Sequence, residues 1–549
     1  MGYFTTRQDF FVMSSTMVVE EREKLDRFLS FLEDSGVAEI LDNDVQTSHE
    51  NGGRPAYNRY DLFATILYGF AFTSGTLRDL ESACHYDLRF IYLMKQETPT
   101  HVVFGNYINK VIMPNLDRIF SCLIKKIFQE CGIEYEDAYV DGTKIEADAN
   151  KYKFVWKPTK YHEDLCEKIR KILEEFDLSR GVPTKGIFPS KIIADKLTEL
   201  TGLESKEPEN SSVIKAVQKM NEYLNKSLEY EEKEEICGPD RNSYYKTDHD
   251  ATAMTLKTDY YSGLASNMHA AYNAQIVVIK GFVCSYYVSQ SRNDITDFIP
   301  VLDKFYELHG VYPKNICADA GYGSLDNYRY LKEHKIGNYV KHQSWEGNVS
   351  GLRPNRYRLN EDETITCLNN KIGNRSDPPY KAHQQNVTFY KITGCKKCEF
   401  RFYCKQYQKR RTDNYKYFEV NEELVHYRQE AEENLLSPKG IEIRVNRSCQ
   451  VEGSYGVLKQ DMQFIRFRRT SLPKVTAEFV LTFIGYNLRK LFKYYSGNLS
   501  TKYWIAPDGL EEEHFKKTSP KKTKNHIKKR KKTSNQIAKD SYKYKKKKG

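Results

Sequence analysis

Apolar residues recur at helical spacing through most of the first 130 residues. The stretch VEEREKLDRFLSFLEDSG shows this spacing and ends at a glycine, and RYDLFATILYGFAF is apolar enough to be a buried helix. Several short helices in succession are typical of a helical bundle and also of a helix-turn-helix DNA-binding domain. The pattern predicts a helical domain over residues 1–130 and leaves both interpretations open.

Short extended segments follow, with helices between them. One extended segment is expected within residues 131–160. Residues 246–344 contain two β-rich runs around Lys280-Gly281, then a helix, a short strand and a helix that Ser324 can cap. Strands and helices in this order predict a mixed α/β sheet with helices packed on it.

Three further stretches interrupt or follow the predicted sheet. Residues 161–245 are helical and strongly charged, which indicates an inserted helical hairpin. Residues 345–440 are expected to be loop-rich and contain a cluster of cysteines. Residues 441–500 are predicted to be C-terminal helices of the sheet domain, and residues 501–549 a disordered basic tail.

Positive charge is concentrated in that tail. The whole chain carries +11, whereas His514 to Gly549 contain sixteen Lys or Arg and one acid, or +15, which leaves −4 on the rest. Such a tail neutralises phosphates through counterion release, although it could also bind any polyanion or only keep the protein in solution. The sequence shows no signal-peptide pattern and no apolar run long enough for a bilayer. The twelve cysteines are therefore expected to be thiols in a reducing, cytoplasmic compartment.

Two aspartates follow short apolar runs. Asp141 in YVDGT and Asp319 in CADAGYG each lie close before a glycine. Carboxylates at the carboxyl ends of strands in an α/β sheet line its functional crevice, and Mg²⁺ prefers such oxygen ligands. Asp-Gly between apolar segments is also a strong hairpin signal, so a turn is the favoured interpretation of Asp141 on local sequence alone.

A third acidic residue lies in VEGSYGVLKQDMQFIRFRR. Glu452 and Lys459 are seven residues apart, so on a helix they would share one face and could hold a metal ion and an adjacent phosphate. Arg466 and Arg468 add positive charge nearby. A surface helix with ordinary charged residues explains the same spacing.

Four segments in order carry a family resemblance: YVDGTKIEADANKYKFVW, YNAQIVVIKGF with YYVSQ, ADAGYGSLDNYRYL and the segment around Glu452. Together they resemble bacterial insertion-sequence transposases of the DDE class, which have an RNase H-like catalytic core. The nearest group is the one numbered eleven eighty-two. The N-terminal helical stretch is also similar to the N-terminal domain of these transposases, which makes it a candidate for binding the element's ends.

The resemblance implies that Asp141, Asp319 and Glu452 are the catalytic acids and hold two Mg²⁺ or Mn²⁺ ions. The site would cut DNA at the terminal inverted repeats and join the 3′ ends to target DNA. The resemblance also implies a homo-oligomeric synaptic complex on DNA, associated with the nucleoid and without a membrane partner.

The resemblance also implies that basic residues near Glu452 contact DNA. Related groups carry a lysine seven residues after the glutamate, which is Lys459 here, to position a phosphate. They also carry an arginine shortly before it. Ser448 occupies that position here, and Arg447 lies one residue away. Arg447, Arg466 and Arg468 are thus further candidates for contact with DNA.

The cysteines in CKKCEFRFYC have the spacing of half a zinc site. Cys395, Cys398 and Cys404 lie in this segment, and Cys367 precedes it. Four thiolates could complete a tetrahedral zinc shell in a region with little apolar material. Lysines, arginines and aromatic residues are interleaved with them, which favours contact with DNA. Reduced, unligated thiols are the alternative.

Other functions fit many of the same residues. A metal-dependent nuclease would cut without strand transfer, a domesticated DNA-binding protein would lack catalysis, and a zinc-dependent adaptor would work through its basic tail. Four rival carboxylates could replace a member of the triad: Glu146, Asp148, Asp248 and Asp250. Trp156 is expected in the core, because aromatic residues dominate cores, and stacking on a flipped base is its alternative role.

Overall fold

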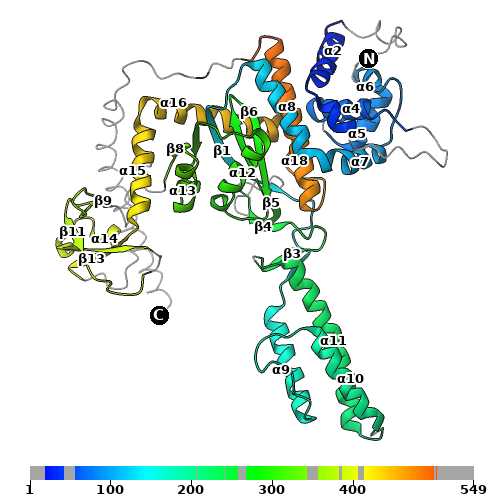
Figure 1. The fold of residues 1–549 in the computed structure, drawn as a ribbon, viewed down its shortest axis with the longest axis vertical. Coiled ribbons are helices and arrows are strands. Elements are labelled where there is room, and N and C mark those ends of the chain that lie inside the picture. The colour runs from blue at the N-terminus through cyan, green and yellow to red at the C-terminus, as the bar shows by residue number, and fades with distance from the viewer. Residues whose placement is uncertain are drawn as a thin grey trace, which may run out of the picture.

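The computed structural model describes residues 19–42, 56–73, 75–206, 208–239, 241–256, 268–342, 357–382, 386–405, 413–499 and 503. The basic tail predicted over 501–549 lies outside these residues, apart from Tyr503. Figure 1 shows four parts: N-terminal helices, a central sheet with its helices, a long helical arm and a small second sheet. Within the described residues, no helix is long and apolar enough to cross a membrane.

Helices make up the N-terminal part. Their bounds are α2 Val19–Asp34, α3 Val37–Asp42, α4 Arg59–Phe72, α5 Leu77–Tyr86, α6 Leu88–Leu93, α7 His101–Tyr107, η2 Ile108–Ile112, η3 Met113–Asn115 and α8 Leu116–Cys131. The Asn58 side chain starts α4 by accepting hydrogen bonds from backbone N–H groups of its first turn. Most of α4 is buried against the long helix α18 (Leu472–Tyr495). A Cβ at Gly485 of α18 would lie 2.4 Å from the Phe70 carbonyl oxygen of α4, so glycine allows the close approach.

The central sheet has both parallel and antiparallel pairs. Its strands are β1 Asp137–Glu146, β4 Thr252–Thr255, β5 Met268–Ile279, β6 Phe282–Ser289, β7 Asn315–Ala318 and β8 Gly337–Val340. They are ordered β4-β5-β1-β7-β8, with β6 also beside β5. β1 is antiparallel to β5 and parallel to β7. The predicted mixed α/β architecture is confirmed, and Lys280-Gly281 forms the predicted hairpin turn between β5 and β6, with positive φ at both residues.

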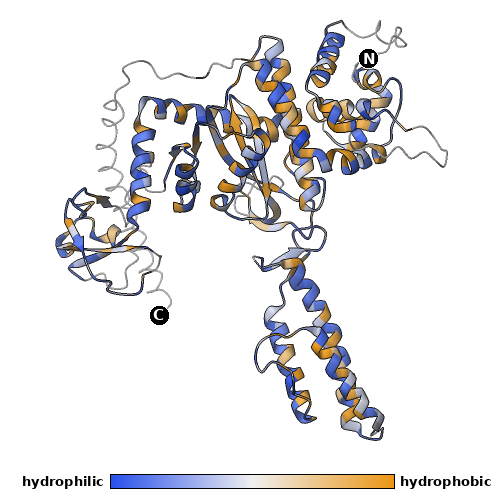
Figure 2. Ribbon diagram, viewed as in Figure 1, coloured by the Kyte–Doolittle hydropathy of each residue, from blue (hydrophilic) through white to orange (hydrophobic). Residues whose placement is uncertain are grey.

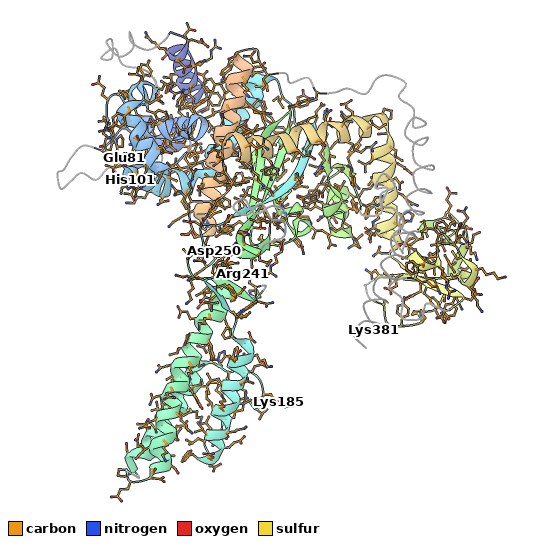
Figure 3. The ribbon with its side chains drawn as sticks, turned by 180° about the vertical axis from the view of Figure 1, so that it is seen from behind. Glu81, His101, Lys185, Arg241, Asp250 and Lys381 are labelled. Atoms are coloured by element: carbon orange, nitrogen blue, oxygen red, sulfur yellow. The ribbon has the colours of Figure 1, made fainter. Side chains whose placement is uncertain are left out.

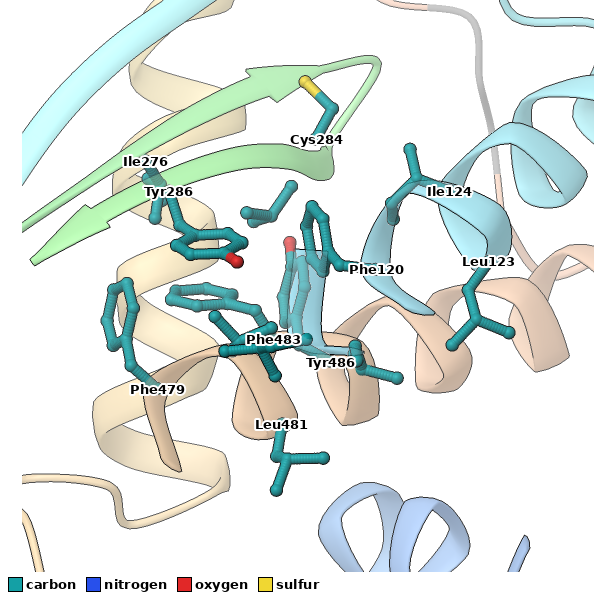
Figure 4. Close-up of a cluster of buried hydrophobic side chains, with 14 of the residues drawn as sticks. Phe120, Leu123, Ile124, Ile276, Cys284, Tyr286, Phe479, Leu481, Phe483 and Tyr486 are labelled. Atoms are coloured by element: carbon teal, nitrogen blue, oxygen red, sulfur yellow. The ribbon is translucent and has the colours of Figure 1, made fainter. Parts of the chain in front are cut away.

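Helices pack on this sheet and fix its ends. They are α12 Phe298–His309, α13 Leu325–Glu333, α15 Glu422–Leu436, α16 Pro438–Arg447 and α18, with short turns η4 Asp294–Thr296 and η5 Ala320–Tyr322. Ser324 caps α13 as predicted, by accepting a hydrogen bond from the Asn327 backbone. Figure 4 shows α8 and α18 meeting the β5–β6 hairpin in one apolar core. There the Tyr286 ring lies edge-on to the Phe120 ring, with centroids 5.1 Å apart.

A helical arm projects from the central part (Figure 1). It contains α9 Thr159–Glu175, α10 Ser190–Lys206 and α11 Ser211–Cys237, with strands β2 Phe154–Trp156 and β3 Ser243–Tyr245 at its base. The three helices enclose a separate core that includes Leu165, Leu200 and Met220. In Figure 2 these helices carry hydrophilic and hydrophobic residues in alternation, whereas α4 is hydrophobic over most of its length. Trp156 lies at the arm's base and is 64% exposed, so its predicted place in the core is wrong.

A second sheet occurs where loops were expected. Its strands are β9 Tyr357–Leu359, β10 Ile365–Cys367, β11 Ile372–Arg375, β12 Thr388–Thr393 and β13 Tyr415–Val420, in the order β13-β12-β11-β10-β9, followed after β12 by η6 Cys395–Lys397 and α14 Arg401–Cys404. Buried residues alternate with more exposed ones along β13, so one face carries a small core. Helix α15 follows this sheet and packs against β8 and α13 of the central part.

Candidate active site

Asp141 lies in the middle of a strand. β1 continues through Asp141-Gly142, and its antiparallel register with β5 runs without a break from Tyr139 to Glu146. The hairpin-turn interpretation of Asp141-Gly142 is therefore wrong, and so is the expectation that Asp141 ends its strand. Glycine is needed at position 142 because a side chain there would meet Gln275. It lies opposite Gln275, and a Cβ at Gly142 would come within 2.2 Å of the Gln275 side-chain nitrogen.

The register of β1 with β7 brings Asp141 level with Asp319. Asp137 pairs with Asn315 and Tyr139 pairs with Cys317 in this parallel ladder. Asp141 and Asp319 are separated in sequence by the same number of residues as each of these two pairs, so the ladder, if continued, would pair them. Asp319 follows β7 directly with extended backbone angles, φ −79° and ψ 179°, so it continues the strand direction. Because alternate residues share a face of a sheet, the two carboxylates lie on one face of neighbouring strands.

A helical segment runs across this face of β1. It consists of α16, η7 Ser448–Glu452, α17 Gly453–Gly456 and η8 Val457–Asp461. Lys439 at its start contacts the carboxylate of Asp137, with Nζ to Oδ2 2.6 Å. Further along, Arg447 Nη2 lies 3.3 Å from Asp141 Oδ1. Lys459 Nζ donates to Thr143 Oγ1 at 2.6 Å. The segment therefore follows β1 from Asp137 to Thr143 and passes over Asp141.

Tyr455 fixes the middle of this segment. Its hydroxyl donates to the carbonyl oxygens of Asp141, at 3.1 Å, and Ala274, at 3.0 Å, and thereby joins the segment to both β1 and β5. Burial raises the pKa of the Tyr455 phenol well above its usual value, and the nearby charge of Asp141 adds to that shift. The hydroxyl therefore remains a hydrogen-bond donor at physiological pH.

Glu452 lies on the same segment, between Arg447 and Tyr455 in sequence. Its side chain is exposed. The residues from Ser448 to Glu452 are π-helical, a conformation whose backbone hydrogen bonds join residues five apart. Arg447 and Glu452 have this spacing, and the π-helical turn offers a structural reason for the one-residue displacement of the arginine. Among the described residues, no three His, Cys, Asp or Glu side chains are gathered closely enough to hold a metal ion.

A buried polar network beneath the two aspartates was not anticipated. Asp294 Oδ1 accepts from the side-chain amides of Asn273 and Gln275, at 2.8 and 3.1 Å. The Tyr322 hydroxyl donates to the side-chain oxygen of Gln275. Burial raises the pKa of Tyr322 well above its usual value, and the negative charges of Asp141, Asp294 and Asp319 contribute further. Asn and Gln at alternate positions of the apolar run YNAQIVV were the available sequence signal, because buried amides need partners.

The rival carboxylates have structural partners. Asp248 and Asp250 accept hydrogen bonds from the backbone N–H groups of Ser471 and Leu472, at 3.1 and 2.7 Å, where α18 begins. Figure 3 labels Asp250 close to Arg241, at the junction between the arm and the central part.

The other two rivals have polar partners at the end of β1. Glu146 Oε1 lies 3.4 Å from His269 Nδ1, and Asp148 Oδ1 lies 2.8 Å from Arg466 Nη2. This second pair also occupies one of the arginines expected to contact DNA. Arg468 has an exposed side chain, and its backbone N–H donates to the buried carboxylate of Glu478.

The four cysteines line a single pocket in the second sheet. Burial raises the pKa of the Cys395 thiol, the charge of Lys405 opposes that shift, and the other three thiols add to it. Lys416 Nζ lies 3.1 Å from Cys404 Sγ. Burial lowers the pKa of the Lys416 ammonium, and Cys404 opposes the shift.

Two family models match parts of the chain. A transposase DDE domain matches residues 366–492, and a transposase domain called DUF772 matches residues 16–110. The first match contains the four cysteines, Glu452 and Lys459, and the second covers most of the N-terminal helices. No curated protein and no solved structure matches the chain significantly. The two matches support a transposase function in general, and the DDE domain implies an enzyme that acts on DNA.

Proposed function

We propose that the protein is an insertion-sequence transposase of the DDE class, closest to the group numbered eleven eighty-two. It would cleave DNA at the ends of its element and join those ends to target DNA. One observation carries this proposal: Asp141 and Asp319 share one level on adjacent parallel strands, under a helical segment that bears Glu452. The two transposase matches at separate parts of the chain agree with it.

The strand order supports an RNase H-like core. Five strands taken in chain order are β1, β5, β6, β7 and β8. Across the sheet their order is β6-β5-β1-β7-β8, and only β5 is antiparallel to the other four. An RNase H-like core has this arrangement, with its catalytic acids on the first and fourth strands. Asp141 on β1 and Asp319 directly after β7 occupy those strands.

The carboxylates suit a divalent cation. Two carboxylates on neighbouring strands repel each other unless a cation lies between them, and Arg447 supplies only part of that charge. Asp141, Asp319 and Glu452 would hold Mg²⁺ or Mn²⁺, ions that prefer oxygen ligands and keep several waters. When bound, two such ions activate the attacking water or 3′-hydroxyl and stabilise the leaving oxygen.

Basic residues around the carboxylates would hold the DNA backbone. Arg447 and Lys459 lie on either side of Glu452 and contact the face of β1 that bears Asp141. The positive charge of Arg447 lies beside Asp141, where it would attract a phosphate brought to the site. The exposed Arg468 would extend the contact along the DNA, and Arg466 would do so only by exchanging its Asp148 partner for a phosphate.

The remaining parts would serve recognition and assembly. The N-terminal helices would bind the terminal inverted repeats, and two or more copies of the chain would pair the element's ends in a cytoplasmic, nucleoid-associated complex. Transposition requires both ends to be cut and joined together, which explains why a homo-oligomer is expected.

Cleavage of a supercoiled plasmid that carries the element's own ends tests this function. With Mg²⁺, the wild-type protein should yield cuts at the ends and joined products. Asp319→Asn should abolish both while DNA binding is kept. Asp326→Asn is the matched control, because Asp326 is an exposed acid on α13 that lies 3.9 Å from Arg329 and is not one of the proposed ligands. End-specific cuts without joining would favour a nuclease, and binding without any metal-dependent cutting would overturn the enzyme proposal.

A further inference from the structure

The four cysteines come from three separate segments of the second sheet. Cys367 ends β10, Cys395 begins the turn η6 and Cys398 follows it, and Cys404 ends α14. Backbone hydrogen bonds shape these turns: Asn370 N donates to the Cys367 carbonyl at 2.9 Å, and Cys398 N donates to the Cys395 carbonyl at 3.3 Å. Two tight turns thus present their cysteines to one pocket, of about 30 Å³, which has room for an ion or one or two waters.

The second sheet has little apolar material to hold it together. Its core consists of six buried residues and a few partly buried ones, which include Cys367, Cys395 and Cys404. Small cores of this kind usually need a metal or a disulfide for stability. None of the four cysteines forms a disulfide within the described residues. A metal held by the thiols would therefore supply stability that the apolar residues cannot.

Two buried lysines bring positive charge to the same pocket. Lys405 and Lys416 both line it and are only 2% and 4% exposed. Lys416 Nζ donates to the Cys404 carbonyl at 2.6 Å and contacts its sulfur, and Lys405 Nζ donates to the Asp413 carbonyl. Lys416 thus places a buried positive charge 3.1 Å from one of the sulfurs, and Lys405 places a second one in the wall of the same pocket.

We propose that this pocket binds one Zn²⁺ through Cys367, Cys395, Cys398 and Cys404, and that Lys405 and Lys416 balance the charge of the site. Four thiolates and one Zn²⁺ carry a net charge of −2, which two ammonium groups neutralise. The thiols turn toward the ion when it binds, because within the described residues no three of them lie close enough together to hold a metal. On binding, each thiol releases its proton to solvent.

Measurement of bound metal in the full-length protein tests the site. The protein, purified without chelators from a zinc-supplemented culture, should contain about one zinc per chain, and added Co²⁺ should give the absorption of a tetrahedral thiolate site. Cys398→Ser and Cys404→Ser should both lose the zinc. Cys449→Ser is the matched control, because Cys449 is exposed and distant in sequence from the four ligands.

A wild-type protein with no zinc and no Co²⁺–thiolate absorption would overturn the proposal, and so would a disulfide between any two of the four cysteines. This outcome is separate from that of the cleavage assay, since the zinc site is not the proposed catalytic site. Loss of DNA cleavage would leave the zinc measurement unchanged.

The role of the lysines has its own test. Lys416→Met should weaken zinc binding by roughly 10- to 100-fold in competition with a chromophoric chelator, as for other partners of metal ligands. Lys416→Arg keeps the charge and should restore most of the affinity. Lys397→Met is the control. Lys397 lies in η6, next to Cys398 in sequence, but its side chain is exposed. Equal zinc affinity in Lys416→Met and wild type would refute the charge balance.

Discussion

A single methyl group at position 142 should disturb the proposed site from beneath. Gly142 faces Gln275, which is fully buried and donates through its amide to Asn273 and Asp294 while it accepts from Tyr322. In Gly142→Ala the new Cβ would lie 2.2 Å from the Gln275 nitrogen and 2.5 Å from its oxygen. The amide must move, and its buried partners lose hydrogen bonds.

The two consequences set the expected size of the effect. Overpacking a buried site and leaving a buried polar group unpaired each destabilise a protein by about 1–3 kcal/mol. We expect Gly142→Ala to lose about 2–4 kcal/mol, which lowers the melting temperature by roughly 5–15 °C in a domain of this size. Without the clash, Ala in a strand would instead be favoured over Gly by about 0.5–1 kcal/mol.

Thermal melting followed by circular dichroism measures this loss, and hydrogen exchange of the β5 amides localises it. Adding Gln275→Ala to Gly142→Ala should recover part of the stability, because the shorter side chain removes the clash. Gly453→Ala is the control, since its Cβ would meet nothing within 4 Å. A Gly142→Ala protein that melts at or above the wild-type temperature would refute this account of the Asp-Gly pair.

Three further predictions concern the site and its surroundings. Arg447→Ala removes the cation 3.3 Å from Asp141 and should slow DNA cleavage by roughly 10²-fold in the plasmid assay; an unchanged rate would exclude Arg447 from the site. Trp156→Ala should leave the melting temperature unchanged but weaken binding to an unpaired DNA end by about 1–3 kcal/mol in fluorescence anisotropy, and a large loss of stability would contradict its exposed position. Burial raises the pKa of Asp297 to about 6, so its contribution to stability is present below about pH 4 and is lost as the pH rises toward 6. The free energy of unfolding should therefore fall by about 3 kcal/mol between about pH 4 and pH 6 in the wild type. In Asp297→Asn the melting temperature should fall less over this pH range, and an unchanged pH profile would contradict the raised pKa.

The sequence carried enough information for the local elements but not for their long-range neighbours. Helix caps such as Ser324 and the Lys280-Gly281 turn were predictable, because their signals lie within a few residues. Asp141-Gly142 has the same local signal as a hairpin turn. Its glycine is explained by Gln275, which is far away in sequence, and no local rule could supply that contact.

The arrangement of the candidate site shows the same limit. The short apolar runs before Asp141 and Asp319 indicated strands, but only the β1–β7 register brings the two aspartates to one level. The π-helical turn before Glu452 also escaped prediction, since its sequence has no distinct periodicity. In the second sheet, short strands with one polar face resembled loops. The cysteine spacing indicated one shared site, and the four cysteines do line one pocket, while zinc binding there stays a prediction.

The most direct test of the central claim maps where a redox-active metal binds. Fe²⁺ can replace Mg²⁺ at oxygen-ligand sites, and with ascorbate and peroxide it cuts the polypeptide close to the bound ion, at points that mass spectrometry identifies. The account predicts cuts beside Asp141, Asp319 and Glu452 that excess Mg²⁺ suppresses and Asp319→Asn removes together. Cuts confined to other parts of the chain, or cuts at these three places that persist in Asp319→Asn, would contradict a shared metal site.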